Sequence, residues 1–244
     1  MTEANTARFN AEALSWDTNP SVQLATTLAH KAYLSHLPPP STLSTYNVLD
    51  LGCGTGLLSL ALAPSVRTLT ALDPSEGMIA ALTHKLETNA PETTSQNILP
   101  ICTLLTSPDN PLLCTDPLTH QTLPSPRRFD IVVSHLVLHH IPSLPEVFAT
   151  IHGCLAPGGR VMVTDFEAFG PEARKFHPEA KMEGVERHGI DAAEMRAILE
   201  GAGFVEVKVE RAFEMEKAVE TEPGSGVLGP VVVFPFLICE GTRV

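Results

Sequence analysis

The stretch VLDLGCGTGLLSLAL, residues 48–62, has the pattern of a strand, a glycine-rich turn and a helix. Its first apolar run ends before glycines at positions 52, 54 and 56, and a second apolar run starts at Leu57. Glycines at such a junction allow a backbone to come close to a ligand. In sheets built of strand–helix–strand units, this turn lies at the carboxyl ends of the strands, where ligands bind. The stretch therefore predicts a ligand site.

The rest of the chain alternates predicted strands with predicted helices. Strands are expected at 46–51, 66–72, 98–105, 129–133 and 160–165, and helices at 57–63, 76–88, 146–155 and 191–201. This alternation predicts a doubly wound α/β fold with a mainly parallel sheet. The last two strands, 204–210 and 231–239, have no helix pattern between them, which favours an antiparallel hairpin at one edge.

Three further segments complete the predicted organisation. Residues 5–37 have helical periodicity and end at the prolines of 38–40, so we expect 1–40 to be an N-terminal helical cap on one domain at 41–244. Residues 106–128 are proline-rich and aperiodic, which indicates a loop insertion. Residues 166–190 are also loop-rich.

Composition argues against several classes of partner. The chain has 244 residues and a net charge of -12, and its first 126 residues carry few basic side chains: Arg8, Lys31, Arg67 and Lys85. Nucleic acids and anionic membranes need clustered basic residues, so neither is expected as a partner. No apolar run has the length of a membrane span and no secretory signal is seen. Five cysteines without metal or redox spacing predict reduced thiols and a cytoplasmic location.

The glycine turn lacks the features of a phosphate site. Leu57 stands where the third glycine of a dinucleotide fingerprint belongs, and no P-loop lysine follows. Asp50, just before the glycines, would repel a pyrophosphate but accept hydrogen bonds from a cationic amino group. Asp73, at the end of the next strand, is placed to accept both hydroxyls of a ribose. An unphosphorylated nucleoside with an amino-acid end is therefore expected, and S-adenosylmethionine fits that description.

The order and spacing of four motifs carry a resemblance to a known family: VLDLGCGTG at 48–56, ALDPSEGMI at 71–79, FDIVVSHLVLHHIP at 129–142 and CLAPGGRVMVTDF at 154–166. With them the chain resembles the class I S-adenosylmethionine-dependent methyltransferases, near the small-molecule group that includes the ubiquinone-biosynthesis C-methyltransferases. The resemblance covers roughly residues 46–166. It implies a Rossmann-like seven-stranded sheet, mostly parallel with an antiparallel last strand, and an acceptor-side segment at 166–190.

The resemblance also implies a set of donor-binding residues: Trp16, Asp50, Gly52, Cys53, Gly54, Gly56, Asp73, Pro74, Met78, Thr106 and Ser134. Asp50 and the glycine backbone would face the methionine part, Asp73 the ribose and Met78 the adenine. Met78 is equally consistent with filling the core, and Trp16 with anchoring its helix. Thr106 stands near the place where relatives usually carry an acidic residue beside the adenine, and a backbone carbonyl is the alternative there.

Histidines are the candidates for the acceptor side. His135 ends the fourth strand, and His188 lies in the segment that covers the acceptor in this family, so both are predicted as bases. An alternative for His188 is the lead-in to a helix capped by Asp191. His139 and His140 are expected to be capping or packing residues. Residues 183–188 offer glutamates beside His188, but without metal-ligand spacing, so no metal is expected.

Methyl transfer is an in-line displacement that needs a nucleophile held at about 3 Å from the methyl carbon and water excluded. We therefore expect transfer to an O, S or N atom of a small molecule, with a base needed for a hydroxyl. One alternative is a protein methyltransferase that receives a basic peptide, because residues from 127 onward carry 18 acidic and 12 basic side chains. Another is a non-catalytic, cofactor-binding regulatory subunit. The sequence leaves the acceptor and the oligomeric state open.

Overall fold

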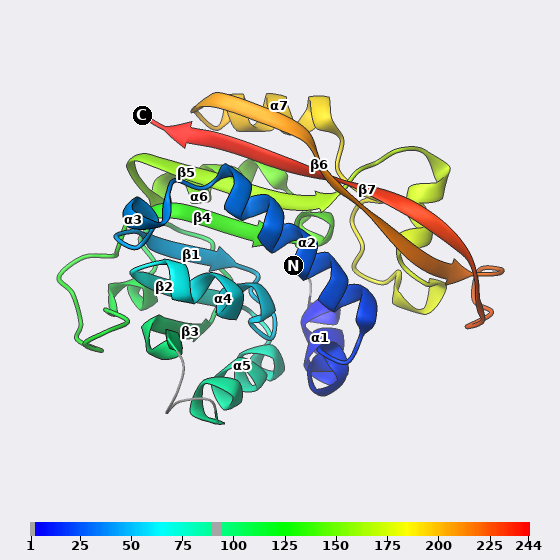
Figure 1. Ribbon diagram of the computed structural model, residues 1–244, viewed down its shortest axis with the longest axis horizontal. Coiled ribbons are helices and arrows are strands. Elements are labelled where there is room, and N and C mark those ends of the chain that lie inside the picture. Colours follow the sequence, from blue (N-terminus) through cyan, green and yellow to red (C-terminus); the bar gives the residue numbers. More distant parts are fainter. Residues whose placement is uncertain (1–2, 89–93) are drawn as a thin grey trace.

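A seven-stranded sheet in the order β3-β2-β1-β4-β5-β7-β6 forms the centre of the computed structural model, which describes residues 3–88 and 94–244 (Figure 1). The strands are β1 (Asn47–Leu51), β2 (Thr68–Asp73), β3 (Ile98–Cys102), β4 (Phe129–His135), β5 (Leu155–Phe166), β6 (Phe204–Glu220) and β7 (Leu228–Arg243). The first five pair in parallel, whereas β7 runs antiparallel to both β5 and β6. The predicted Rossmann-like α/β class with an antiparallel last strand is confirmed.

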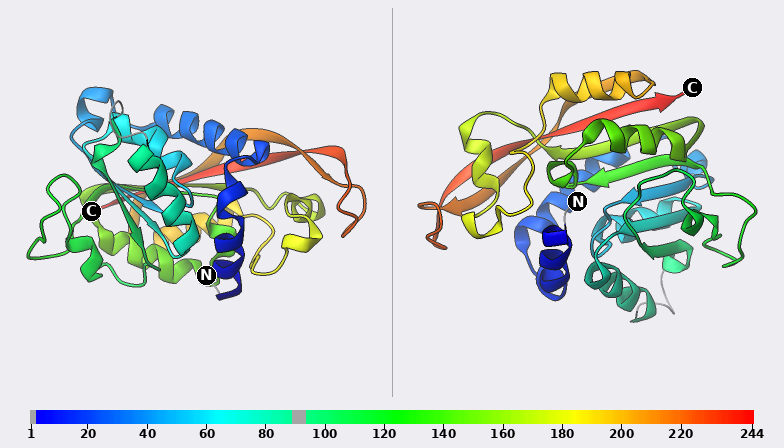
Figure 2. Two further views of the ribbon diagram at one scale, coloured as in Figure 1. Left: turned by 90° about the horizontal axis from the view of Figure 1, so that it is seen from below. Right: turned by 180° about the vertical axis from the view of Figure 1, so that it is seen from behind.

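Helices cover both faces of this sheet (Figure 2). They are α1 (Glu3–Trp16), α2 (Pro20–His36), α3 (Pro40–Leu43), α4 (Leu57–Leu62), α5 (Glu76–Thr88), α6 (Leu144–Cys154) and α7 (Ala192–Gly201). Side chains of α2, α4 and α5 share one apolar core with the sheet, and those of α6 and α7 share another. Neighbouring residues of one strand enter different cores, as Val48 and Leu49 do, because side chains alternate across a strand.

Some boundaries differ from the sequence-based expectation. The expected helical block at 5–37 is two helices, because the chain turns at residues 17–19 and Asn19 caps α2 by accepting a hydrogen bond from the Ser21 N–H at 3.0 Å. The first two residues of the expected 1–40 cap lie outside the described residues. Within the described residues, no helix combines the length and apolarity needed to cross a membrane.

The β6–β7 hairpin is much longer than expected and extends past the end of the other strands (Figure 1). Its pairing continues to Glu220 opposite Leu228. Residues 167–190 lie beside this extension, and the ring of Phe176 stacks on Phe166 with centroids 4.1 Å apart. Phe234 and Phe236 of β7 complete the apolar contact. The hairpin therefore gives the loop-rich segment a surface to pack on beyond the carboxyl ends of the parallel strands.

Helix α1 bridges the two sides of this carboxyl edge. The Asn10 side-chain oxygen accepts hydrogen bonds from Ser75 Oγ at 2.7 Å and from the Gly77 N–H at 2.8 Å, at the start of α5. On the opposite side, the Arg8 guanidinium donates to the carbonyl of Lys181 at 2.7 Å. These contacts place α1 across the ends of the strands, between α5 and the 167–190 segment (Figure 2).

Tyr33 joins α2 to the centre of the sheet. Its side chain is fully buried, and its hydroxyl donates to the carbonyl of Ser134 at 2.6 Å and lies 2.9 Å from Thr164 Oγ1. These partners are the ends of β4 and β5, so one side chain fixes the helix against the two strands that lead into the carboxyl edge.

We predict that Tyr33→Phe lowers the free energy of unfolding by about 1–3 kcal/mol, because the Ser134 carbonyl loses its buried donor. Urea denaturation of the ligand-free protein measures this change. Tyr46→Phe is the matched control, since Tyr46 is only half-buried, and it should change stability by less than about 0.5 kcal/mol. Equal urea midpoints for Tyr33→Phe and the wild type would contradict the assigned role.

Candidate active site

The glycine turn after β1 packs tightly against its protein neighbours. Gly52 and Gly56 have φ angles of +74° and +81°, which favour glycine. A Cβ atom at Gly52 would lie 2.4 Å from a methyl carbon of Val137, and one at Gly56 would lie 2.3 Å from a methyl carbon of Leu82. The N–H groups of residues 52 and 53 both donate to the carbonyl of Leu72, at 2.8 and 2.9 Å. The pattern of glycines therefore fixes the turn against the end of β2.

Two carboxylates are buried beside this turn. Asp50 accepts a hydrogen bond from Ser59 Oγ at 2.6 Å, and burial raises the pKa of its carboxyl to about 7. Asp73 accepts hydrogen bonds from the N–H groups of Gly54 at 3.0 Å and Ser75 at 2.8 Å. Burial also raises the pKa of Asp73, and these two hydrogen bonds oppose the shift. Neither carboxylate has a cationic side chain bonded to it within the described residues.

Both carboxylates line one cavity of about 320 Å³ that runs below α1. The predicted site residues that the structure brings together there are Trp16, Asp50, Gly52, Cys53, Gly54, Asp73, Met78 and His135. Trp16 packs edge-on against Phe9 with ring centroids 5.6 Å apart, and Met78 is buried in the same small apolar cluster. Trp16 and Met78 therefore both anchor α1 and line the cavity.

The remaining predicted donor-site residues lie elsewhere. Pro74 and Thr106 line a second cavity of about 290 Å³, which shares Gly52 with the first. Gly56 and Ser134 line neither of these cavities. Ser134 is buried, and its hydroxyl donates to the carbonyl of Leu51 at 2.7 Å, so its side chain links β4 to β1.

His135 presents one imidazole nitrogen without a partner. The Tyr33 hydroxyl donates its proton to the Ser134 carbonyl, so in its contact with Thr164 it must accept and the Thr164 hydroxyl donates. Having used its proton there, Thr164 Oγ1 accepts a hydrogen bond from the Nδ1–H of His135 at 2.8 Å. The lone pair is then on Nε2, which is buried and forms no hydrogen bond within the described residues. Burial lowers the pKa of His135 to about 4, so the ring is neutral at pH 7.

His188 is exposed and lines neither cavity. The alternative interpretation of this stretch fits the structure, because the Asp191 side chain caps α7 by accepting hydrogen bonds from the N–H groups of Ala193 and Glu194, both at 2.9 Å. The geometry gives His188 no contact with the cavity that holds Asp50 and Asp73.

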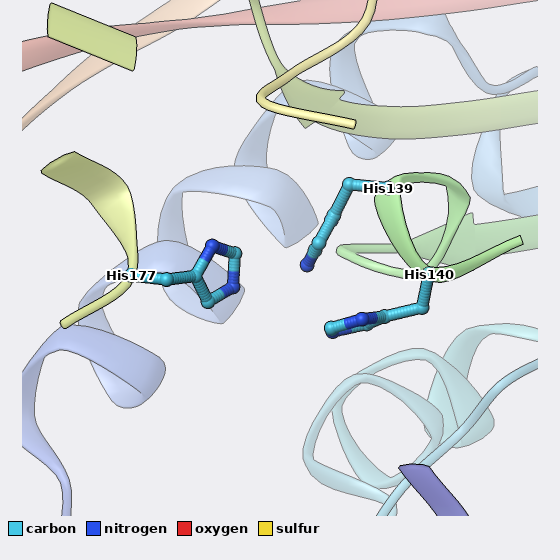
Figure 3. A group of neighbouring side chains, drawn as sticks. All are labelled: His139, His140 and His177. Carbon is cyan, nitrogen blue, oxygen red and sulfur yellow. The ribbon is translucent and has the colours of Figure 1, made fainter. Parts of the chain in front are cut away.

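The sequence interpretation missed a set of three histidines. His139 and His140, in the short 3-10 turn Leu138–His140 after β4, line the main cavity together with His177 from the 166–190 segment. Figure 3 shows the three rings around a common space. The double histidine was the available signal, but its third member comes from a distant segment.

A comparison with protein families matches residues 22–209 to the methyltransferase domain model. An uncharacterized methyltransferase, C1347.09 of Schizosaccharomyces pombe, is 31% identical over 151 residues, which are 60% of this chain and 48% of the relative. The ubiquinone biosynthesis O-methyltransferase of Coxiella burnetii (strain Dugway 5J108-111) is 30% identical over 156 residues, 64% of this chain and 58% of that protein. The chain thus spans about half the length of these relatives.

The fold agrees with this match. The crystal structure of magnesium protoporphyrin IX methyltransferase from Synechocystis PCC 6803 with bound SAH superposes with a TM-score of 0.57 at 17% identity, covering 91% of this chain and 84% of that one. The chain belongs to the methyltransferase domain family.

We predict that Asp50→Asn stabilises the ligand-free protein at pH 7.5 by roughly 2–4 kcal/mol. The native carboxyl keeps its proton up to about pH 7, whereas the unfolded one releases it near 3.8. The native state therefore binds more protons between these values, and the contribution of Asp50 to stability is lost as the pH rises through that interval. Urea denaturation at several pH values should show a gap between variant and wild type that widens from pH 4 to 7.

The control for this experiment is Glu87→Gln, an exposed carboxylate on α5, for which no pH-dependent gap is expected. A destabilised Asp50→Asn protein, or a gap that is constant with pH, would contradict the assigned cost of burying this carboxylate.

Proposed function

We propose that the chain transfers a methyl group from S-adenosylmethionine to a hydroxyl oxygen of an anionic small molecule bound below α1. The observation that carries this proposal is the single cavity that joins Asp50 and Asp73 to the neutral His135 imidazole. The name of the Coxiella burnetii relative, a ubiquinone biosynthesis O-methyltransferase, supports oxygen as the acceptor atom. Transfer to N or S atoms is an outcome that the acceptor assay below distinguishes.

On the donor side, the buried carboxylates are the main groups. Asp50 would accept hydrogen bonds from the donor ammonium, which restores the charge balance that burial disturbs. Asp73 would bind the ribose hydroxyls with the oxygen lone pairs that Gly54 and Ser75 leave free. The second cavity, with Pro74 and Thr106, adjoins the first at Gly52 and is proposed for the adenine.

The donor site predicts a pH-dependent affinity. Calorimetry should show S-adenosylmethionine binding that weakens by roughly an order of magnitude between pH 7.5 and 6, because Asp50 must lose its proton, with a pKa of about 7, to pair with the ammonium. Asp73→Ala should lower the affinity at least about tenfold at pH 7.5, through the lost ribose contacts. Asp109→Asn, an exposed carboxylate far along the chain, is the control. An unchanged affinity in Asp73→Ala would contradict the donor site.

On the acceptor side, the cavity wall carries cations. Lys217 is half-buried with its ammonium 4.1 Å from the centroid of the Phe176 ring, and partial burial lowers its pKa to about 8. Within the described residues, no carboxylate forms an ion pair with it. Arg8, Lys175 and Lys181 line the same cavity together with Glu12 and Glu220, and the two lysines are paired with Glu172 and Glu12. The ammonium of Lys217, which has no such pair in the described part of the chain, therefore favours an anionic acceptor over the basic peptide of a protein methyltransferase.

The transfer is written as one displacement. The acceptor oxygen forms a bond to the methyl carbon while the carbon–sulfur bond breaks and its electron pair stays on sulfur. His135 Nε2 accepts a hydrogen bond from the acceptor hydroxyl and takes its proton. A pKa of about 4 makes this imidazole a weak base. Its main contribution is therefore to orient the acceptor hydroxyl, and it takes the proton only as the new carbon–oxygen bond forms.

We predict that His135→Asn lowers kcat by about 10–100-fold with little change in the affinity for S-adenosylmethionine. The Asn amide can still donate to Thr164 as Nδ1–H does, but it offers no group at the position of Nε2. His188→Asn is the matched control, because His188 is exposed, and its kcat should equal that of the wild type. Loss of activity in His188→Asn with full activity in His135→Asn would reverse the assignment.

The acceptor itself is identified with methyl-labelled donor. Phenols and hydroxy acids, amines, thiols and a cell extract are incubated with the protein, and the label is followed into small molecules or protein bands. Label in anionic hydroxy compounds is expected. Label only in protein bands would favour the protein methyltransferase, and donor binding without any labelled product would favour a non-catalytic regulatory subunit.

The proposal also covers the domain organisation, the location and the partners of the chain. Residues 1–40 act as a helical cap and 41–244 as one methyltransferase domain, with a loop insertion at 106–128 and an acceptor-side segment at 166–190. The contacts of α1 with that segment support this division. Five free cysteines support a cytoplasmic location, and the net charge of -12 argues against nucleic-acid partners.

A further inference from the structure

We propose that His139, His140 and His177 bind a divalent transition-metal ion, Zn²⁺ or Fe²⁺ in class, at the acceptor end of the cavity. One potential ligand atom from each imidazole lies within 4.8 Å of the others. Three histidine ligands with open positions toward a cavity are a recurring arrangement for a metal that binds an exchangeable ligand.

The three rings converge although they come from separate elements. The centroids of His139 and His140 are 4.0 Å apart, and that of His177 lies 4.9 Å from His139 and 5.8 Å from His140. Figure 3 shows His139 and His177 pointing toward each other, with His140 beside the gap between them. A tetrahedral ion bound at about 2.1 Å holds its nitrogens about 3.4 Å apart. Since the ligand atoms lie within 4.8 Å of one another, the nitrogens would approach by up to about 1.4 Å on binding.

Hydrogen bonds fix which nitrogens are free to bind. His140 Nδ1 lies 2.9 Å from the carbonyl of Gly184, which only accepts, so this nitrogen carries the proton. His139 Nδ1 lies 2.9 Å from both oxygens of Asp165 and donates to that carboxylate. Because Nδ1 donates in both rings, Nε2 is the nitrogen left to bind a metal.

Asp165 has the position of an orienting group. It is fully buried at the end of β5 and also accepts a hydrogen bond from the backbone N–H of His139 at 3.1 Å. A carboxylate that accepts a hydrogen bond from the rear nitrogen of a histidine raises the basicity of the metal-binding nitrogen and fixes the ring.

His177 supplies an independent indication of a ligand. Its Nδ1 is buried and forms no hydrogen bond within the described residues. Packing alone does not explain three polar rings whose free nitrogens gather in a space lined by Phe166 and Phe176. A cation shared by one nitrogen of each ring would give all three rings a polar partner.

The nearby cations indicate what completes the coordination. Arg8 and Lys217 line the same cavity and would repel a bare metal ion. An anionic oxygen ligand between the ion and these side chains removes that repulsion. This part of the inference rests on the proposed function: the anionic hydroxy acceptor would bind the ion through oxygen, which favours its ionised form and compensates for the weak basicity of His135.

The test is metal binding by the tag-free protein, which needs neither donor nor acceptor. After incubation with Zn²⁺ and desalting, elemental analysis should find one ion per chain, and Co²⁺ should give the visible absorption of a histidine-bound site. His177→Ala and His140→Gln should each lower the Zn²⁺ affinity at least about 100-fold. Asp165→Asn should lower it about 10–100-fold, as an orienting residue. His84→Ala, an exposed histidine on α5, should bind as the wild type does.

Calorimetry with S-adenosylmethionine on the same samples separates the possible failures. Donor binding retained in His177→Ala and His140→Gln shows that the variants are folded and makes a lost metal affinity specific. Absence of Zn²⁺, Co²⁺ and anaerobically added Fe²⁺ from the wild type would overturn the metal site and leave the donor site intact. An unchanged Zn²⁺ affinity in both histidine variants would overturn it as well.

Discussion

Burial of Asp50 and Asp73 at the ends of neighbouring strands is the constraint on which the site depends. Removing these carboxylates from water is unfavourable, as the raised pKa of both groups indicates. Only hydroxyl and backbone N–H donors offset this cost in the ligand-free protein. The glycine turn makes the contacts possible, because a side chain at Gly52 or Gly56 would collide with its neighbours. A cationic, hydroxyl-bearing ligand supplies the missing interactions, which is what the methyl donor offers.

The acceptor side depends on long-range packing instead. The β6–β7 hairpin extends beyond the parallel strands, the 167–190 segment packs on it, and α1 spans both sides of the cavity. Hydrogen bonds through Thr164 and Tyr33 place a proton on Nδ1 of His135, and the hydrogen bond to Asp165 does the same for His139. In both rings the Nδ1–H is bonded to a protein oxygen, which leaves Nε2 as the nitrogen that can bind a hydroxyl proton or a metal ion.

The donor half of the site could be predicted from the sequence because it is local. Asp50, the glycines and Asp73 follow two strand ends that the parallel sheet necessarily brings to one edge. The length of β6 and β7 could not be predicted, because it depends on pairing and on packing against residues 167–190. His177 approaches His139 through that same packing, so their spacing in sequence carries no signal. Exposure of His188 likewise follows from how the loop leads into α7.

The most direct test of the account is a crystal structure of the protein with S-adenosylhomocysteine. The account predicts that the homocysteine ammonium contacts Asp50, that the ribose hydroxyls contact Asp73, and that the sulfur faces His135 across the cavity below α1. Adenine bound in the second cavity, beside Pro74 and Thr106, would complete the predicted pose. A product whose sulfur faces away from His135, or whose ammonium lies apart from Asp50, would contradict the claim that one cavity joins donor and acceptor.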